Sequence, residues 1–193
     1  IHLYHVYGLQ WHHPYLQLHL RCQDQEPMVI CSWGNNGGHR PQVAMPLSVY
    51  SDEHFMNEAY KLAIQAKEED EIPVGAIVIC ENKIIGKGYN QTEKLNDVTA
   101  HAEILAITAA QNYLGAKYLK GCTMFVTLEP CIMCAGGLYW AQLDRLVYGA
   151  SDNMRGFTKI KQKVLHAKTS FEEGVMAKEC GDLVKIFFKE LRK

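Results

Sequence analysis

Two short motifs contain residue types that bind metals and move protons. Cys131 and Cys134 are separated by two residues, and His101 is separated from Glu103 by one. Thiolate sulfur and imidazole nitrogen are ligands of zinc, and a carboxylate beside bound water can act as a general acid and base. Each motif alone is also compatible with packing thiols, a redox pair or an acid that complements a helix dipole. Their combination indicates a catalytic metal site.

The spacing predicts that the two cysteines share one face at the start of a helix. The expected helix begins at Pro130, where the missing N–H group costs nothing, and runs to about Leu143. The positive end of the helix dipole favours thiolate there. His101 precedes a second expected helix over residues 102–111, whose dipole helps to keep the imidazole neutral for ligation. We therefore expect two helix starts to converge on one metal ion.

Three protein ligands are typical of catalytic zinc, whereas structural zinc usually has four. Cys122 is the nearest candidate for a fourth ligand, but it precedes a strand that should carry it away from the cysteine pair. Water would fill the open position, and zinc lowers the pKa of bound water from about 15.7 to about 7. Glu103 should point away from the ligand direction, which makes it a proton carrier rather than a co-ligand.

The hydrophobic pattern predicts a layered α/β domain that positions these motifs. Ser51 should cap a helix that ends in a solvated acidic run at residues 68–71 and stops before Pro73. We expect strands over residues 74–80, 84–90, 123–128 and 145–149, the first two forming a hairpin, and a final helix over about 177–191. This order indicates helices packed on one sheet.

The overall composition is that of a globular protein and excludes several classes. The formal net charge of -1 excludes a uniformly basic nucleic-acid coat protein. The chain has seven cysteines and no secretory signal, so we expect no disulfide framework. It also has no apolar run near the roughly 20 residues of a membrane helix. We expect a cytoplasmic protein with no membrane partner.

The motifs belong to a recognisable pattern. Residues 99–103 read Thr-Ala-His-Ala-Glu, and residues 127–135 read Thr-Leu-Glu-Pro-Cys-Ile-Met-Cys-Ala. They resemble the zinc signature of the cytidine and deoxycytidylate deaminase superfamily and, within it, the bacterial tRNA-specific adenosine deaminase family. The resemblance covers about residues 52–193 and includes residues 73–76, 88–90, 149–152 and 179–188.

The resemblance implies a three-layer α/β/α fold around a mixed sheet, one zinc ion per subunit and a homodimer. It implies hydrolytic conversion of the wobble adenosine of a tRNA anticodon to inosine. By motif match, Glu103 becomes the proton shuttle, and the backbone N–H of Cys131 assists at the zinc-bound water. The metal ligands would be His101, Cys131 and Cys134. The substrate contacts would be Asn90 at the base, Ala102, Asp152 near the RNA backbone, and Phe187 and Phe188 near the anticodon loop.

The composition changes near residue 50. Residues 1–50 hold six of the nine histidines but only four charged residues, Arg21, Asp24, Glu26 and Arg40. We interpret residues 1–48 as an unassigned, disordered or non-native extension, and residues 49–193 as the zinc-dependent deaminase domain. A second metal site is the alternative for the histidine cluster, which comprises His2, His5, His12, His13 and His19.

The C-terminal region supports an RNA substrate but leaves alternatives open. Residues 153–171 contain several basic residues and no acidic residue. Further basic residues accompany Phe187 and Phe188 on the last helix. Basic side chains suit phosphate contact, and aromatic rings suit stacking on an unpaired base. A solvated basic face with both phenylalanines in the core is the other interpretation. Residues 153–159 depart from the small-residue, Gly/Ala/Ser-rich loop of the family, which borders the substrate entrance. The resemblance therefore specifies the chemistry more firmly than the substrate.

Two other functions compete with a tRNA adenosine deaminase. The first is a deaminase of free guanine, cytosine or a nucleoside, because Tyr139 and Trp140 resemble guanine deaminases, although we expect both rings to lie in the helix core. The second is a non-catalytic zinc module that binds RNA.

Overall fold

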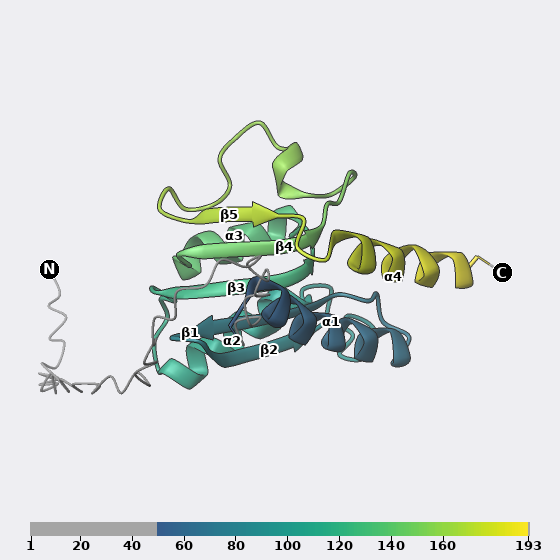
Figure 1. The fold of residues 1–193 in the computed structure, drawn as a ribbon, viewed down its shortest axis with the longest axis horizontal. Coiled ribbons are helices and arrows are strands. Elements are labelled where there is room, and N and C mark those ends of the chain that lie inside the picture. Colours follow the sequence, from purple (N-terminus) through teal and green to yellow (C-terminus); the bar gives the residue numbers. More distant parts are fainter. Residues whose placement is uncertain (1–49, 193) are drawn as a thin grey trace, which may run out of the picture. The chain divides into compact units, whose positions relative to one another are not determined.

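A five-stranded sheet runs through the part of the chain that the computed structural model describes, residues 50–192 (Figure 1). The main elements follow in the order α1 (Asp52–Glu68), β1 (Gly75–Cys80), β2 (Lys83–Tyr89), α2 (Ala102–Leu114), β3 (Cys122–Leu128), α3 (Ile132–Ala141), β4 (Arg145–Ala150), β5 (Ser170–Glu173) and α4 (Ala177–Glu190). The strand order is β2-β1-β3-β4-β5. Strand β1 is antiparallel to both β2 and β3, whereas β3, β4 and β5 run parallel. The expected mixed sheet is confirmed.

Helices cover both faces of the sheet, because successive strand residues point to opposite sides. On β3, Met124 and Val126 belong to the core beneath α2 and α3, whereas Phe125 belongs to the core beneath α1 and α4. Strand β4 alternates in the same way, with Leu146 and Tyr148 on the first side and Val147 on the second. The expected three-layer α/β/α fold is therefore confirmed.

The hairpin and its glycines determine how closely α2 approaches the sheet. Glu81 and Asn82 join β1 to β2, and both have positive φ angles (48° and 60°), as a two-residue type I′ turn requires. On β2, a side chain at Gly88 would overlap the carbonyl oxygen of Ala102, and one at Gly86 would overlap the backbone of α2. These glycines let the start of α2 lie directly on the strand.

Three expectations about exposure and strands are wrong. Trp140 is 76% exposed and Tyr139 is also exposed, so neither ring lies in the helix core. The acidic run at residues 68–71 is not wholly solvated, because Glu71 is buried. The sequence did not predict strand β5, because its four residues lack an apolar alternation, and all four are exposed in the structure. The ring of its Phe171 stacks on Tyr148. The other helices and strands agree with their predicted spans to within a few residues.

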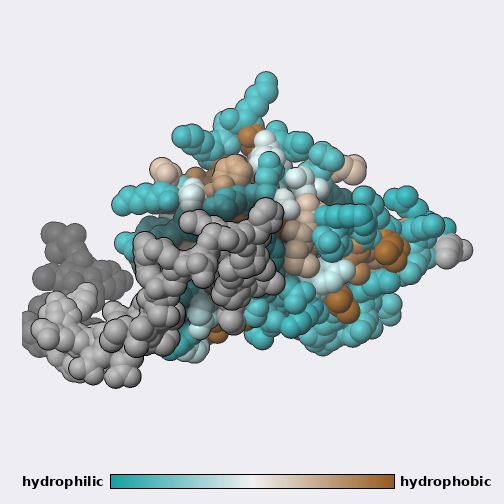
Figure 2. Space-filling view, viewed as in Figure 1, coloured by the Kyte–Doolittle hydropathy of each residue, from teal (hydrophilic) through white to brown (hydrophobic). Residues whose placement is uncertain are grey.

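The surface in Figure 2 is mostly hydrophilic, with apolar side chains in small patches, some of them over the region where α1 and α4 lie in Figure 1. Within residues 50–192, no helix combines the length and the apolar character that crossing a membrane requires. The interpretation of residues 1–48, including the histidine cluster, falls outside the described residues.

Candidate metal centre and active site

Three potential metal ligands come together where α2 and α3 begin. The Nδ1 atom of His101 lies 3.4 Å from the Sγ atom of Cys134 and 3.7 Å from that of Cys131. All three ligand atoms lie within 4.8 Å of one another. Among residues 50–192, no other group of histidine, cysteine and acidic side chains gathers in this way. The five cysteines of this range are all free thiols.

These distances fit a zinc ion. With zinc–sulfur bonds of about 2.3 Å and zinc–nitrogen bonds of about 2.0–2.1 Å, tetrahedral ligands lie roughly 3.5–3.8 Å apart. The two measured nitrogen–sulfur distances are close to that range. Two thiols and one imidazole are zinc donors, and three of them leave one tetrahedral position for a water molecule or a substrate atom. Cys122 lies at the far end of β3, opposite Cys80, and does not join the cluster.

The two helix starts converge as expected, but α3 begins later than expected. It starts at Ile132, so Cys131 is the N-cap residue and Pro130 lies before the cap rather than at the first helical position. Cys131 is extended (φ -71°, ψ 172°) and forms an isolated bridge with Gly156, which delays the helix. Cys134 still lies in the first turn, and His101 is the N-cap residue of α2.

The contact between the two cysteines moves their pKa values in opposite directions. The hydrogen bond with Cys134 lowers the pKa of Cys131 to about 4, and the same contact raises the pKa of Cys134. Of the two thiols, Cys131 therefore ionises more readily. The contact with Cys131 also raises the pKa of His101. Thiolate is the form of cysteine that binds zinc, so the lowered pKa of Cys131 suits a metal ligand.

Glu103 lies in the first turn of α2 and is only 4% exposed. Its burial raises the pKa of its carboxyl group. An acid that merely complemented the helix dipole would face solvent, so that alternative does not describe Glu103. The side chain faces the same cavity as His101 and Cys131. Its carboxylate is not part of the three-ligand cluster, in line with the prediction that it is not a ligand.

A cavity of about 760 Å³ opens above the metal ligands. Of the predicted substrate contacts, Asn90, Asp152 and Phe188 line it, whereas Ala102 and Phe187 do not. Ala102 is fully buried in the core under α2. Phe187 is 6% exposed and Phe188 is 38% exposed, so the structure divides the phenylalanine pair between the protein interior and the cavity. The interpretation that both phenylalanines lie in the core fits only Phe187, and the interpretation that both face the RNA fits only Phe188.

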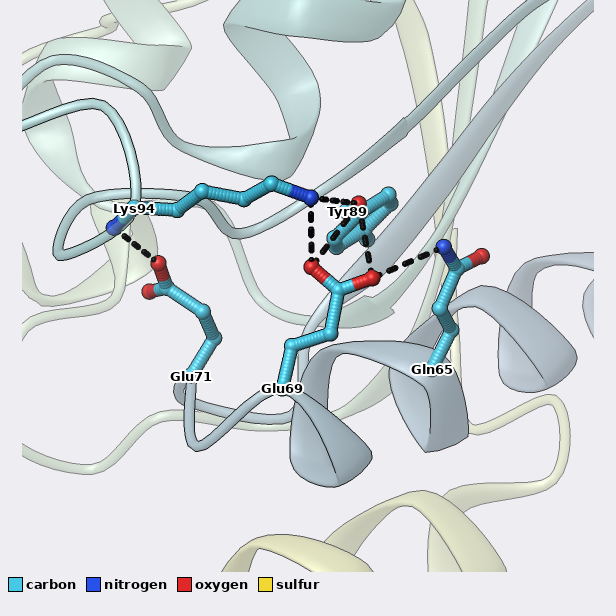
Figure 3. A network of polar contacts seen from close by, with 5 residues as sticks. All are labelled: Gln65, Glu69, Glu71, Tyr89 and Lys94. Atoms are coloured by element: carbon cyan, nitrogen blue, oxygen red, sulfur yellow. Dashed lines mark hydrogen bonds and ion pairs between the residues drawn. The ribbon is translucent and has the colours of Figure 1, made fainter.

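A buried network holds Asn90 at the cavity. The Nδ2 group of Asn90 donates to Oε2 of Glu71 at 2.9 Å and to the hydroxyl of Thr92 at 3.1 Å. The backbone N–H of Lys94 donates to the other carboxylate oxygen of Glu71 (Figure 3). Because a carboxylate only accepts hydrogen bonds, the amide of Asn90 must direct its nitrogen toward Glu71. Its Oδ1 atom remains as the acceptor.

A second set of side chains surrounds this network nearer the surface. The carboxylate of Glu69 accepts hydrogen bonds from Gln65, Tyr89 and Lys94 (Figure 3). The sequence gives no direct sign that two acids two residues apart, Glu69 and Glu71, would have such different surroundings. The turn at Asp70 (φ 60°) separates them.

Asp152 begins a loop that forms one wall of the cavity. Its Oδ1 atom accepts hydrogen bonds from the backbone N–H groups of Met154 (2.8 Å) and Arg155 (3.0 Å). Asn153, Met154 and Arg155 all line the cavity. Glu129 lines it as well and was not predicted as a functional residue; its only sequence signal is an acid between a strand and the Pro-Cys pair.

Comparison with known proteins supports the same interpretation of the fold and site. Residues 49–150 match the family described as the cytidine and deoxycytidylate deaminase zinc-binding region. A tRNA-specific adenosine deaminase of Aquifex aeolicus (strain VF5) is 40% identical over 145 residues, which cover 72% of this chain and 95% of that protein. The tRNA-specific adenosine deaminase of Bacillus subtilis (strain 168) is 37% identical over 147 residues, covering 74% and 91%.

Two solved structures are also similar to this chain. One from a study of A-to-I editing by tRNA:A34 deaminases at the wobble position of transfer RNA is 38% identical, with a TM-score of 0.64; the match covers 67% of this chain and 98% of that one. A guanine deaminase from Bacillus subtilis is also 38% identical, with a TM-score of 0.51, over 52% of this chain and 65% of that one.

The layered sheet and the His-Cys-Cys cluster define a zinc-binding deaminase with a cytidine-deaminase-like fold. Within this class, the chain belongs to the tRNA-specific adenosine deaminase family. The resemblance seen in the sequence is confirmed.

Proposed function

We propose that this protein hydrolyses adenosine to inosine at the wobble position of a tRNA anticodon. The observation that carries the proposal is the cluster of His101, Cys131 and Cys134. Two of its members, His101 and Cys131, line one cavity together with Glu103. The relatives of this chain are named tRNA-specific adenosine deaminases, and the match covers nearly their whole length.

The reaction replaces an amino group by oxygen. A bond forms between a water oxygen and C6 of adenine, and the bond from C6 to the exocyclic nitrogen breaks. Water supplies the oxygen, and ammonia leaves with the added protons. Bound zinc would supply a lower pKa for its water molecule, so that hydroxide is available at neutral pH. His101, Cys131 and Cys134 would hold the metal.

Glu103 would move the protons between water and the departing amine. Its carboxylate takes the proton that water loses during attack and returns it to the exocyclic nitrogen, which must be protonated to leave as ammonia. The burial of Glu103 keeps solvent away from this transfer. Asn90 would hold the base, because its Oδ1 atom is left as an acceptor for an N–H group of the substrate.

The lining of the cavity favours a polynucleotide over a free base. Three cationic side chains, Arg155, Lys185 and Arg192, lie around it together with the aromatic ring of Phe188. Cations suit phosphate contact, and an exposed ring suits stacking on an unpaired base. The carboxylate of Asp152 accepts backbone N–H groups of its own loop. Asp152 would therefore approach the RNA backbone as part of that loop.

Deamination of a free base is the second candidate, and the similarity to a guanine deaminase from Bacillus subtilis favours it. A direct comparison separates the two. The zinc-loaded protein is incubated with adenosine-containing anticodon stem-loop RNA, the matching cytidine-containing RNA, and free guanine. We expect inosine from the first RNA and little product from the others. Xanthine from guanine, without inosine from RNA, would overturn the proposal.

The remaining proposals concern assembly and place. We propose one zinc ion per subunit, a homodimer and a cytoplasmic location, where tRNA substrates are found. The metal content of the purified protein, relative to protein concentration, tests the stoichiometry. Light scattering during size-exclusion chromatography tests the dimer; a monomer mass at micromolar concentration would contradict it.

A further inference from the structure

Glu129 has a buried carboxylate that the proposed reaction does not use. The side chain is 3% exposed and lies between the last residue of β3 and the Pro-Cys pair that precedes α3. Its Oε2 atom accepts the backbone N–H of Asp152 at 2.9 Å, and its Oε1 atom accepts that of Thr158 at 2.9 Å. Both oxygens are therefore committed to one loop, residues 152–158.

The rest of this loop is fitted closely around Glu129. A side chain at Gly156 would overlap the Glu129 carboxylate, so the loop backbone passes directly against it. The N–H of Phe157 donates to the carbonyl of Pro130 at 3.0 Å, and Gly156 forms a bridge with Cys131. The loop is thereby attached to the same segment that supplies a metal ligand.

The loop held by Glu129 carries Arg155, a cationic side chain that lines the cavity. Its backbone N–H is held by Asp152, while its side chain is exposed and lines the cavity. No carboxylate of residues 50–192 lies within ion-pair distance of its guanidinium group. Lys185, which also lines the cavity, differs because it pairs with Asp182 at 3.4 Å. An unpaired guanidinium matches the geometry of a phosphate group.

We propose that Arg155 is a specificity-determining residue that contacts a phosphate of the RNA substrate, and that Glu129 is the positioning residue that holds it there. This inference rests on the proposed function, because it takes RNA as the substrate. A free base carries no phosphate, so the contact favours a nucleotide within a chain. Glu129 acts through the loop backbone, because both of its carboxylate oxygens accept backbone N–H groups of the loop.

Binding of a fluorescein-labelled anticodon stem-loop RNA, followed by fluorescence anisotropy, tests the contact. In Arg155→Ala, we expect the Kd to rise roughly tenfold, because a charge-assisted hydrogen bond is lost. The slope of log Kd against log salt concentration should fall by about one, as for the loss of one phosphate contact. Arg155→Lys, which keeps the charge but loses the planar fork, should recover part of the affinity.

A double-mutant cycle of RNA affinity tests whether Glu129 acts through Arg155. Glu129→Gln places an amide N–H group against a backbone N–H donor, so one attachment of the loop is lost. Its Kd and salt slope should change in the same direction as those of Arg155→Ala. The double variant Glu129→Gln/Arg155→Ala should bind within about twofold of Arg155→Ala alone, because both changes remove one contact. Full additivity of the two effects would overturn the positioning role.

Loop attachment can be measured without any substrate. Hydrogen exchange at the peptide that contains residues 152–158 should become faster in Glu129→Gln, while exchange in β3 and α3 stays unchanged. Gly156→Ala is a second variant, since it disturbs the same contact from the loop side and should have the same effect. Zinc content and melting temperature verify that both variants are folded.

Asp144→Asn provides the matched control. The Asp144 carboxylate also accepts a backbone N–H, from Gly121 at 3.0 Å, but it lies at the opposite end of the parallel strands. This variant should leave RNA affinity and exchange at residues 152–158 unchanged. A wild-type protein that forms no inosine from RNA would overturn the proposed function. An active wild type whose Arg155→Ala variant keeps its Kd and salt slope would overturn this inference alone.

Discussion

The metal-binding corner, formed by His101, Cys131 and Cys134, contains a locally placed cysteine pair, whereas the cavity wall at residues 152–158 is attached to Glu129 by distant contacts. At the corner, Cys131 and Cys134 occupy the N-cap and the first turn of one helix, so their relative position follows from a spacing of three residues. At the wall, Glu129 holds residues that follow it by 23 and 29 positions. His101 joins the cysteine pair from 30 and 33 positions earlier in the chain, so this part of the site also depends on a distant contact. Only the cysteine pair is placed locally, whereas the attachment of the wall through Glu129 depends on distant residues that meet in the fold.

This difference predicts distinct consequences of mutation. Changes at the corner should abolish the reaction, with or without loss of the metal. Changes at the wall should leave the metal in place and alter how tightly RNA binds. The following variants test this distinction.

The largest effect is expected from Cys134→Ser. A serine hydroxyl does not ionise at neutral pH and is a poor zinc ligand, so bound zinc and deaminase activity should both fall to background. Metal analysis after dialysis and inosine formation from RNA are the measurements. Cys80→Ser is the control, because Cys80 lies outside the ligand cluster and should keep both. Full zinc content in Cys134→Ser would show that the corner has another ligand.

Glu103→Gln should separate metal binding from catalysis. The amide has nearly the same shape but cannot take a proton from water, so kcat should fall by about 10²–10⁴-fold with zinc retained. Steady-state kinetics and metal analysis check both parts. Glu53→Gln is a matched control, since Glu53 also lies in the first turn of a helix but faces solvent. Unchanged kcat in Glu103→Gln would mean that another group moves the protons.

The phenylalanine pair on α4 should show the difference between the interior and the wall. Phe188→Ala removes a ring from the cavity and should raise KM for RNA by an amount equivalent to about 1–3 kcal/mol of stacking energy. Phe187→Ala leaves a hole in the interior and should lower the free energy of unfolding by about 3–5 kcal/mol. Kinetics and urea denaturation measure the two effects. The opposite assignment of effects would mean that Phe187 contacts RNA.

The smallest of these effects is expected at the two acids of Figure 3. Glu71→Gln should weaken the orientation of Asn90 and raise KM several-fold, in line with about 1 kcal/mol for a perturbed buried hydrogen bond. Glu69→Gln changes the neighbouring exposed network and should leave KM unchanged. Equal KM values for the two variants would mean that the orientation of Asn90 does not affect substrate binding.

The sequence alone determined which three potential ligands come together and most of the layered fold, and it predicted Glu103 as the proton carrier beside them. Strands β1, β3 and β4 were predictable because each is a continuous apolar run, and α1 because Ser51 caps it. His101 and the cysteine pair were predictable because helix starts can be recognised from a few adjacent residues. Even there, the bridge between Cys131 and Gly156 moved the start of α3, since it depends on a residue 25 positions away.

Only the tertiary structure decided which side chains are buried and which line the cavity. Glu71 belongs to a run that was predicted to be solvated, and nothing in the sequence indicated that Glu129 is buried. Folding buries both acids and places N–H donors from distant loops beside them. Trp140 looks like a core residue but lies on the side of α3 that faces solvent. The physical reason is that burial depends on which face of an element packs against the sheet. Contacts between distant residues set that face, and they also set the wall that we propose selects RNA.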